Sequence, residues 1–520
     1  MSTLAEPAAA PRADASRHAS PTGDAPWGLR RSPALPAAVC LGVAVVSLVL
    51  PATLAFDPWA WLVWGREVLH LDLDSTGGPS WKPLPVLFAT GMAATGDLAP
   101  TVWLVAGRTA GLLALVFAFR LAARCAGPAA GAVAAGLVVL TPDGGPRFLR
   151  LVTEGHADAL SATLCLWAVE RHLDGKRAHA LVLGTGLALM RPEAWPFLGL
   201  YALWLWRREP RRRALIVALL VAVPVLWFGG DWWGSGSPWH GADAAQVVSG
   251  TAADRFGLAF ERMVKVVVPP AWVLAGVAVA GAWRRRDRVL PALAGGALAW
   301  FALVVGMSVA LRYAALSRFL LPGAVLLCVL AGIGAVRAVT WAAERAVGAV
   351  ASPAGTDRRR RRVAVAGAVA VAVIGSLPAV LPRVLAFGAL ADEIAMRARL
   401  ERSLDEALDR AGGPDAVLAC GRVVISTSDV PRMALAWKLA VPLHDVDRRL
   451  RGEPGVVFAQ RGGRLDRELG AALGAGEGTG GQEGAAGREG AGGSGSGGRA
   501  VTLVARSAEW TVYGVGCPEG

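Results

Sequence analysis

The sequence predicts an α-helical polytopic membrane protein with a small extracytoplasmic α/β domain at its C-terminal end. Of the 520 residues, 54% are hydrophobic and only 18% are charged, and the mean hydropathy is +0.45. Soluble domains carry about 25% charged residues, so this composition favours the membrane class. The apolar residues also come in blocks of roughly twenty, the length that crosses a hydrocarbon core of about 30 Å.

The net charge of +13 has two interpretations, nucleic-acid binding or a membrane topology signal. Basic residues occur in short runs between the apolar blocks: RREPRRR (207–213), RRRDR (284–288) and RRRRR (358–362). Such runs are typical of the cytoplasmic loops of membrane proteins, so no nucleic-acid partner is expected.

About eleven membrane helices are predicted, with a cytoplasmic N-terminus and an extracytoplasmic C-terminus in the plasma membrane. In this orientation the cytoplasmic segments hold 25 Lys and Arg residues, and the outer loops before the C-terminal region hold 10. The predicted spans are 35–55, 100–119, 127–141, 157–170, 179–190, 194–206, 214–230, 267–283, 289–311, 319–336 and 363–382.

The remaining segments divide the chain into three parts. Residues 1–34, rich in Ala, Pro and Ser, are expected to form a disordered cytoplasmic tail, and 35–383 the transmembrane domain. Two segments of that domain, 57–70 with its three tryptophans and 83–97, are expected to be helices lying at the outer face. The arms 179–190 and 194–206 are short, but the basic residues on both sides require the chain to go out and return.

Residues 384–520 are predicted to form the extracytoplasmic α/β domain. A helical pattern over 392–410 precedes four β-like runs, which are AVLAC, VVIST, VTLVA and WTVYGV. Residues 471–499, almost entirely Gly, Ala, Glu and Ser, are expected to be a flexible low-complexity loop within this domain.

Four of the six cysteines lie inside apolar blocks, where a thiol behaves as a small hydrophobic group. Cys420 and Cys517 are the two in the polar C-terminal region, which the topology places in an oxidising compartment. We therefore predict a disulfide between them, with two free thiols as the alternative. The spacing of Cys and His residues does not resemble a metal site, and neither a metal nor another cofactor is predicted.

Ionisable residues at membrane depth are costly, so their positions indicate function. They gather at four places on the outer side, each with a structural alternative: a solvated carboxylate, a helix cap, an ion-paired turn, or arginines reaching lipid headgroups. Together they offer carboxylates that accept a proton and cations that stabilise a phosphate. These places contain Asp57, then Glu154, His156 and Asp158, then Arg191 and Glu193, and finally Arg312 and Arg318.

The order of these motifs resembles the GT-C class of glycosyltransferases that use polyprenyl-phosphate sugars, such as protein O-mannosyltransferases and lipid A aminoarabinose transferases. The resemblance covers roughly 35–385. Its motifs are Asp57 after the first span, Arg66-Glu67, Lys82-Pro83-Leu84, Glu154 and the Arg-Pro-Glu turn. This turn and two further segments, DWWGSGSPWHGADA (231–244) and RY…RFLLP, are similar to those of actinobacterial mannosyltransferase-like members. The chain departs from the class in one respect, because a single acid follows the first span where many members have two.

The resemblance implies an inverting transfer of a mannose-like or pentose sugar from a polyprenyl-phosphate donor to a lipid, glycan or protein acceptor on the outer face. It implies that Asp57 and Glu154 are the catalytic carboxylates and leaves open which of them is the base. The donor-binding residues it implies are Lys82, Arg66, Arg191, Glu193, Arg312, Arg318 and His156. The class as a whole does not require a metal.

Two other functions remain alternatives. A lipid-linked-sugar flippase or transporter would show internal repeats and charges near the midplane, whereas these charges gather at the outer face. A non-catalytic membrane scaffold for the C-terminal domain would leave the outer acids without a role.

Overall fold

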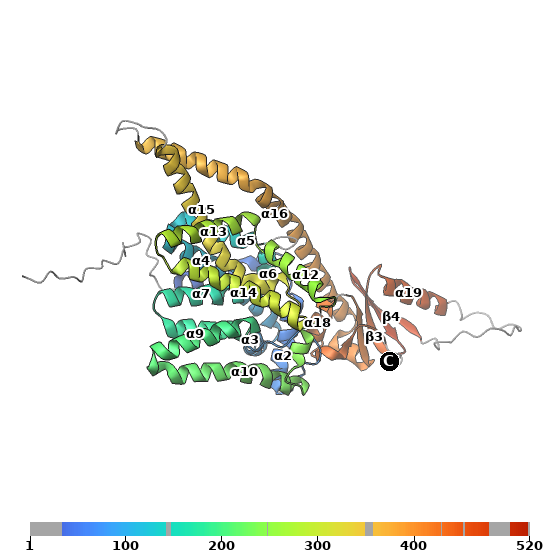
Figure 1. Cartoon of the computed structure of the whole chain (residues 1–520). Helices are drawn as coiled ribbons and strands as arrows, with labels where there is room; N and C mark the ends of the chain where they lie inside the picture. Colours follow the sequence, from blue (N-terminus) through green and yellow to red (C-terminus); the bar gives the residue numbers. More distant parts are fainter. Residues whose placement is uncertain are drawn as a thin grey trace, which may run out of the picture.

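The computed structural model of the chain describes residues 34–141, 147–246, 248–348, 357–427, 429–450, 453–477 and 500–517. A large helical bundle carries a small C-terminal domain built on a mixed sheet (Figure 1). The tail expected over 1–34 lies outside the described residues apart from its last residue.

The bundle and its peripheral helices precede the sheet in the sequence. Each of the predicted spans overlaps one of these helices. They are α1 (Ala34–Val46), α2 (Phe56–His70), α3 (Pro83–Ala93), α4 (Ala99–Ala126), α5 (Pro128–Val139), α6 (Arg147–Thr153), α7 (Asp158–Leu173), α8 (Arg177–Ala188), α9 (Trp195–Arg208), α10 (Arg213–Ser235), α11 (His240–Ala244), α12 (Ala252–Lys265), α13 (Pro269–Arg284), α14 (Val289–Leu311), α15 (Leu321–Gly348) and α16 (Asp357–Arg410).

Within the described residues, five helical segments are long and apolar enough to cross a membrane, or six if the bent pair α12 and α13 is one span. The other helices are shorter: the 12 residues of α5 extend only about 18 Å, less than a hydrocarbon core of about 30 Å. The protein is thus a multi-pass membrane protein, and the total of eleven spans stays a prediction. The five segments are Gly96–Ala126, Pro210–Ser235, Val289–Leu311, Ser317–Val347 and Arg359–Arg410.

Helix α15 lies at the centre of the bundle, with 89% of its most apolar window buried by neighbouring helices. Two glycines allow this close packing. A Cβ atom on Gly334 would lie 1.8 Å from the carbonyl oxygen of Leu274 in α13, and one on Gly332 would lie 2.5 Å from that of Ala130 in α5. Small residues are how membrane helices bring their backbones together, so α15 forms the core against which the site is built.

The short arms α8 and α9 meet at a 3₁₀ turn, Pro192–Ala194. Arg191 and Glu193, on either side of Pro192, are 1% and 0% exposed, so this turn lies inside the protein and not in water. The arms can therefore be short because the chain reverses direction within the bundle.

Helix α2 differs from the expectation that its tryptophans sit at the membrane–water boundary. Trp59, Trp61 and Trp64 are at most 2% exposed, because α3 and the C-terminal domain cover this helix. The second outer helix expected, over 83–97, forms as α3 and packs on α2. The tryptophan side chains of α2 are thus buried by protein and are not available to lipid.

Helix α16 joins the bundle to the C-terminal domain as one continuous helix of 54 residues (Figure 1). None of its most apolar window is buried, as expected for a surface that faces lipid. The separate helix expected over 392–410 is instead the C-terminal part of α16.

The C-terminal domain contains a five-stranded sheet with the order β2-β1-β3-β5-β4. Strand β1 is parallel to β2 and β3, whereas β5 is antiparallel to β3 and β4. Its elements are α17 (Gly413–Ala419), β1 (Arg422–Ser426), α18 (Asp429–Lys438), β2 (Val446–Asp447), β3 (Gly455–Gln460), α19 (Arg464–Glu477), β4 (Val501–Arg506) and β5 (Trp510–Val515).

Two local expectations for this domain were wrong. The AVLAC run lies in helix α17 and its C-cap, because Pro414 in the first turn favours a helix start. Residues 471–477, expected to belong to the loop, are instead part of helix α19, which continues to Glu477. The rest of the expected loop segment, 478–499, lies outside the described residues.

Cys420, at the end of α17, and Cys517, just after β5, are joined in a disulfide with their Cα atoms 5.2 Å apart. The bond links the beginning of the sheet domain to its last strand.

Candidate functional site

A cavity of about 480 Å³ opens where several segments of the bundle meet. Its walls come from the start of α2, the segment 78–82, the turn after Arg191, the end of α10 with the following loop, and the connection between α14 and α15. Of the residues predicted to form the site, Asp57, Lys82, Arg191 and Arg318 line this cavity.

Asp57 lies in the first turn of α2, where a carboxylate interacts favourably with the helix dipole. It is 3% exposed, and its Oδ2 lies 3.0 Å from Nη1 of Arg318 and 3.7 Å from Nζ of Lys82. Burial raises the pKa of this carboxyl, but the charges of Arg318, Lys82, His156 and Arg191 outweigh burial and lower the pKa to about 2. Asp57 is therefore ionised and held by two cations.

Lys82 immediately precedes α3 and is 9% exposed, with Nζ 5.1 Å from the ring centre of Trp61. Burial and the positive charge of Arg191 lower the pKa of Lys82 to about 7, although Asp57 opposes this shift. The ammonium group therefore changes its charge near neutral pH.

The Arg-Pro-Glu turn makes two buried polar contacts, an ion pair from Arg191 and a hydrogen bond to Glu193. Arg191 forms an ion pair with Asp158 at the start of α7, and its guanidinium lies 4.1 Å from the ring centre of Phe319. Glu193 accepts a hydrogen bond of 2.9 Å from the hydroxyl of Tyr313, which also lines the cavity. These contacts fix the turn against α7 and the α14–α15 connection.

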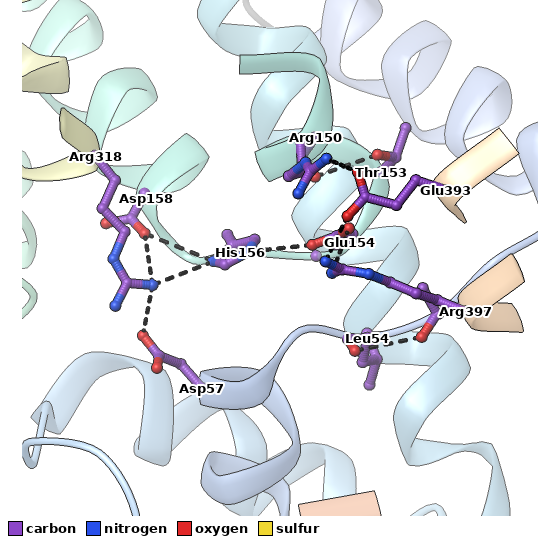
Figure 2. A network of polar contacts seen from close by, with 12 residues as sticks. Leu54, Asp57, Arg150, Thr153, Glu154, His156, Asp158, Arg318, Glu393 and Arg397 are labelled. Carbon is purple, nitrogen blue, oxygen red and sulfur yellow. Dashed lines mark hydrogen bonds and ion pairs between the residues drawn. The ribbon is translucent and has the colours of Figure 1, made fainter. Parts of the chain in front are cut away.

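Arg318 links Asp57 to a chain of charged residues that leads away from the cavity (Figure 2). Its Nη1 lies 3.9 Å from Oδ2 of Asp158 and 3.5 Å from Nδ1 of His156. Burial lowers the pKa of His156, although a hydrogen bond with Glu154 opposes this, so the imidazole is mainly neutral at pH 7. His156 thus supports Arg318 from behind.

Glu154 continues this chain and does not line the cavity. One of its oxygens lies 3.5 Å from His156 Nε2, and the other accepts a hydrogen bond of 3.0 Å from Arg397 in α16 (Figure 2). Burial raises the pKa of Glu154. The contacts with His156 and Arg397 lower this pKa by more than burial raises it, so the net shift is downward. This carboxylate is engaged by α16 and is poorly placed to act on a substrate in the cavity.

Two residues predicted to bind the donor lie elsewhere. Arg66 donates hydrogen bonds of 3.0 and 2.9 Å to the carbonyl oxygens of Trp437 and Val441, because α2 packs on α18 of the C-terminal domain. Arg312 ends α14 with a left-handed φ of 56° and donates to the carbonyl oxygen of Val248, leaving its side chain exposed. Neither lines the cavity.

Several cavity residues were not predicted as site residues. Asp231 near the end of α10 is 4% exposed and lines the cavity together with several aromatic residues. The signal for Asp231 was its position at the predicted outer end of a span, since ionisable groups at this depth are costly. The aromatic cavity residues are Phe56, Trp195, Trp227, Phe228, Trp239, Tyr313 and Phe319.

No protein-family model matches the sequence, and no curated protein matches it. The structure is similar to ArnT from Cupriavidus metallidurans in the apo state, with 18% identity, a TM-score of 0.50 and coverage of 92% of this chain and 97% of that chain. It is similar to the same protein bound to undecaprenyl phosphate at 17% identity, with the same TM-score and coverage. The archaeal oligosaccharyltransferase AglB from Archaeoglobus fulgidus, in complex with an inhibitory peptide and a dolichol-phosphate, aligns at 12% identity and a TM-score of 0.46 over 82% of this chain and 69% of that chain.

The likeness to ArnT shows that the two proteins share a fold over nearly their whole lengths. Among the residues that the structure describes, no group of three or more His, Cys, Asp or Glu side chains is placed to hold a metal ion.

Proposed function

We propose that this protein is a membrane glycosyltransferase that transfers a sugar from a polyprenyl-phosphate donor to an acceptor on the outer membrane face. The observation that carries the proposal is a buried carboxylate, Asp57, held between Lys82 and Arg318 on the wall of a cavity. A phosphate needs cations and an acceptor needs a base, and this arrangement offers both within one site.

In this proposal, Arg318 and Lys82 bind the phosphate of the donor. Arg318 presents a guanidinium, which matches phosphate oxygens with two hydrogen bonds, and Lys82 adds a compact ammonium charge. Arg191 contributes a third positive charge, although its ion pair with Asp158 keeps it as part of the wall. The low dielectric of the buried site strengthens each of these interactions.

The reaction is a single displacement. The acceptor oxygen bonds to the anomeric carbon while the bond from that carbon to the phosphate oxygen breaks, which inverts the configuration. The acceptor proton passes to the carboxylate of Asp57, and the polyprenyl phosphate leaves with the electron pair, stabilised by Lys82 and Arg318.

Donor binding also activates Asp57. With the cavity empty of phosphate, Arg318 and Lys82 hold the pKa of this carboxyl near 2, which makes it a weak base. A bound phosphate draws on the same two cations and weakens their hold, so the pKa of Asp57 rises and the carboxylate becomes a better proton acceptor. The base therefore gains strength only when the leaving group is in place.

Glu154 has a supporting role in this proposal. It positions His156 behind Arg318 and connects the site to α16 through Arg397. Asp57 is thus the base, and the sugar is mannose-like or a pentose, as the resemblance to the class implies. The acceptor is a lipid, a glycan or a protein.

Sugar transfer in membranes tests this function. Membranes that contain wild-type protein, Asp57→Ala or Asp97→Ala are incubated with radiolabelled polyprenyl-phosphate mannose and arabinose, with total envelope acceptors. Asp97 is an exposed acid between α3 and α4, so its variant controls for the loss of a charge. We expect transfer by wild type and by Asp97→Ala, with a decrease of about 10²- to 10⁴-fold for Asp57→Ala. Full transfer by Asp57→Ala at equal expression would contradict the assignment of Asp57 as the base.

A further inference from the structure

Asp231 is a buried carboxylate that the reaction above does not use. Its Oδ2 accepts a hydrogen bond of 2.9 Å from the backbone N–H of Gly241, whereas Oδ1 has no hydrogen-bond partner within the described part of the chain. The residue is 4% exposed and lines the same cavity as Asp57. A buried carboxylate oxygen without a partner costs free energy, which a ligand that donates a hydrogen bond would recover.

Asp231 lies next to the segment that ends in Lys82. The hydroxyl of Ser80 donates a hydrogen bond of 2.7 Å to the carbonyl oxygen of Gly241. A Cβ atom on Gly241 would lie 2.8 Å from Oδ2 of Asp231 and 3.0 Å from the backbone nitrogen of Trp81. Only glycine permits this approach, which brings the carboxylate against the chain that carries a phosphate-binding lysine. Gly241 thus connects Asp231 to Trp81, the residue before Lys82.

Aromatic rings form the rest of this wall. Trp195 lies edge-on to Trp227 at 5.9 Å and to Phe228 at 6.0 Å, and Phe228 lies edge-on to Trp239 at 4.9 Å, measured between ring centres. All four line the cavity. The C–H faces of a sugar ring pack on aromatic rings, while its hydroxyl groups need hydrogen-bond acceptors. This wall supplies the rings together with one carboxylate acceptor, Asp231.

We propose that Asp231 and this aromatic wall form the subsite for the donor sugar, with Oδ1 of Asp231 accepting a hydrogen bond from a sugar hydroxyl. The proposal rests on the proposed function, because it takes the ligand to be a polyprenyl-phosphate sugar. It separates the donor into two parts: the cations bind the phosphate, and Asp231 recognises the sugar.

The test compares bare and sugar-bearing lipids on the purified full-length protein. Radiolabelled undecaprenyl phosphate is displaced by unlabelled undecaprenyl phosphate or by undecaprenyl-phosphate mannose and arabinose, for wild type and Asp231→Asn. Asparagine keeps an oxygen for the N–H of Gly241 and turns the free acceptor into an amide donor. Asp243→Asn is the matched control, because Asp243 is an exposed acid in the short helix α11 that follows α10, and it does not line the cavity.

We expect at least one sugar-bearing lipid to bind wild type more tightly than undecaprenyl phosphate does. Asp231→Asn should weaken that lipid about tenfold, as for loss of a hydrogen bond to a charged group, without changing the affinity for undecaprenyl phosphate. The Asp243→Asn protein should match wild type with both.

Three results would overturn the inference. If sugar-bearing lipids bind wild type no more tightly than the bare lipid does, the protein has no sugar subsite. If a sugar-bearing lipid binds Asp231→Asn and wild type with equal affinity, Asp231 is not part of that subsite. An equal loss for both lipids would make Asp231 part of the phosphate site or a structural residue. In each of these cases the wild-type protein still binds lipid phosphate, whereas a wild-type protein that binds neither lipid removes the proposed function as well.

Discussion

Nη1 of Arg318 lies 3.0 Å from Oδ2 of Asp57, although the two residues are 261 positions apart in the sequence. Asp57 opens α2, and Arg318 lies in the 3₁₀ turn that leads into α15. The contact is buried, since the two side chains are 4% and 18% exposed. A phosphate in the cavity would compete with Asp57 for this guanidinium, so the ion pair couples occupancy of the site to the basicity of the carboxylate.

The first prediction concerns the pH dependence of donor use. The pKa of Lys82 is about 7 in the folded protein, so the ammonium is present below this pH and lost above it. We expect kcat/KM for the donor to fall as the pH rises through about 7, because this parameter reports the free enzyme. Lys82→Arg should remove the fall, since arginine stays charged. A wild-type profile that is flat from pH 6 to 8.5 would contradict this role.

The lowered pKa of Lys82 also determines the direction in which its contribution to folding stability changes with pH. The pKa of Lys82 is lowered on folding from its ordinary value of 10.5, so between about pH 7 and 10.5 the unfolded state binds more protons. This residue's contribution therefore makes the folded state more stable as the pH rises through that window. Lys82→Met should lose this part of the pH dependence of thermal unfolding.

The second prediction assigns Arg66 to the attachment of the C-terminal domain. Its guanidinium lies 5.2 Å from the ring centre of Trp437 and donates to two carbonyl oxygens of that domain. We expect Arg66→Ala to increase proteolytic cleavage of the C-terminal domain without changing the affinity for undecaprenyl phosphate. Arg312→Ala, which removes an exposed arginine at the end of α14, is the matched control. A decrease of tenfold or more in the lipid's affinity for Arg66→Ala would return Arg66 to the donor site.

The third prediction concerns Cys420 and Cys517. Their bond spans 97 positions, and the chain-entropy account gives a loop of this size at most about 4–5 kcal/mol of stabilisation. Mass spectrometry without reductant should find the two peptides linked, and Cys517→Ser should lower the unfolding temperature. Cys125→Ser, at a free cysteine in the bundle, is the control. Alkylation of both thiols without reductant would contradict the bond in the native protein.

The fourth prediction fixes the side of the membrane. Arg397 of α16 contacts Glu154, and a Cβ atom on Gly78 of the cavity would touch Leu443 of the C-terminal domain, so this domain and the cavity share one side. The distribution of basic residues places that side outside. A reporter active only in the cytoplasm should therefore be silent when fused after Gly520. An active reporter would move the cavity to the cytoplasmic face.

The sequence was sufficient to predict a mostly helical multi-pass membrane protein, and each predicted span overlaps a helix of the structure. It also singled out Asp57, Lys82, Arg191 and Arg318, which line one cavity. Apart from Lys82, which was predicted only from the resemblance, these predictions follow from local rules: apolar blocks form membrane helices, and ionisable groups at membrane depth are costly. The resemblance to a known class then supplied an order of motifs.

Long-range contacts are what the sequence did not predict. Arg66 and Glu154 match the motifs of the class, but Arg66 donates to the carbonyl oxygen of Trp437 in α18 and Glu154 accepts a hydrogen bond from Arg397 in α16, and neither contact has a local signal. The tryptophans of α2 carried the pattern of a membrane boundary because sequence alone does not reveal that a domain hundreds of residues away covers them. Asp231 was not predicted as a site residue because its position near Trp81 depends on the close approach of Gly241 to both residues.

The most direct test measures both products of the proposed reaction at once. Purified protein in lipid bilayers is given a polyprenyl-phosphate sugar and an acceptor extract, and sugar on the acceptor and free polyprenyl phosphate are quantified together. For wild type we predict equal amounts of the two products. For Asp57→Asn we predict that both decrease by about 10²- to 10⁴-fold while binding of undecaprenyl phosphate persists. Recovery of the donor intact but on the opposite leaflet, as a flippase would leave it, or undiminished turnover by Asp57→Asn, would contradict the account.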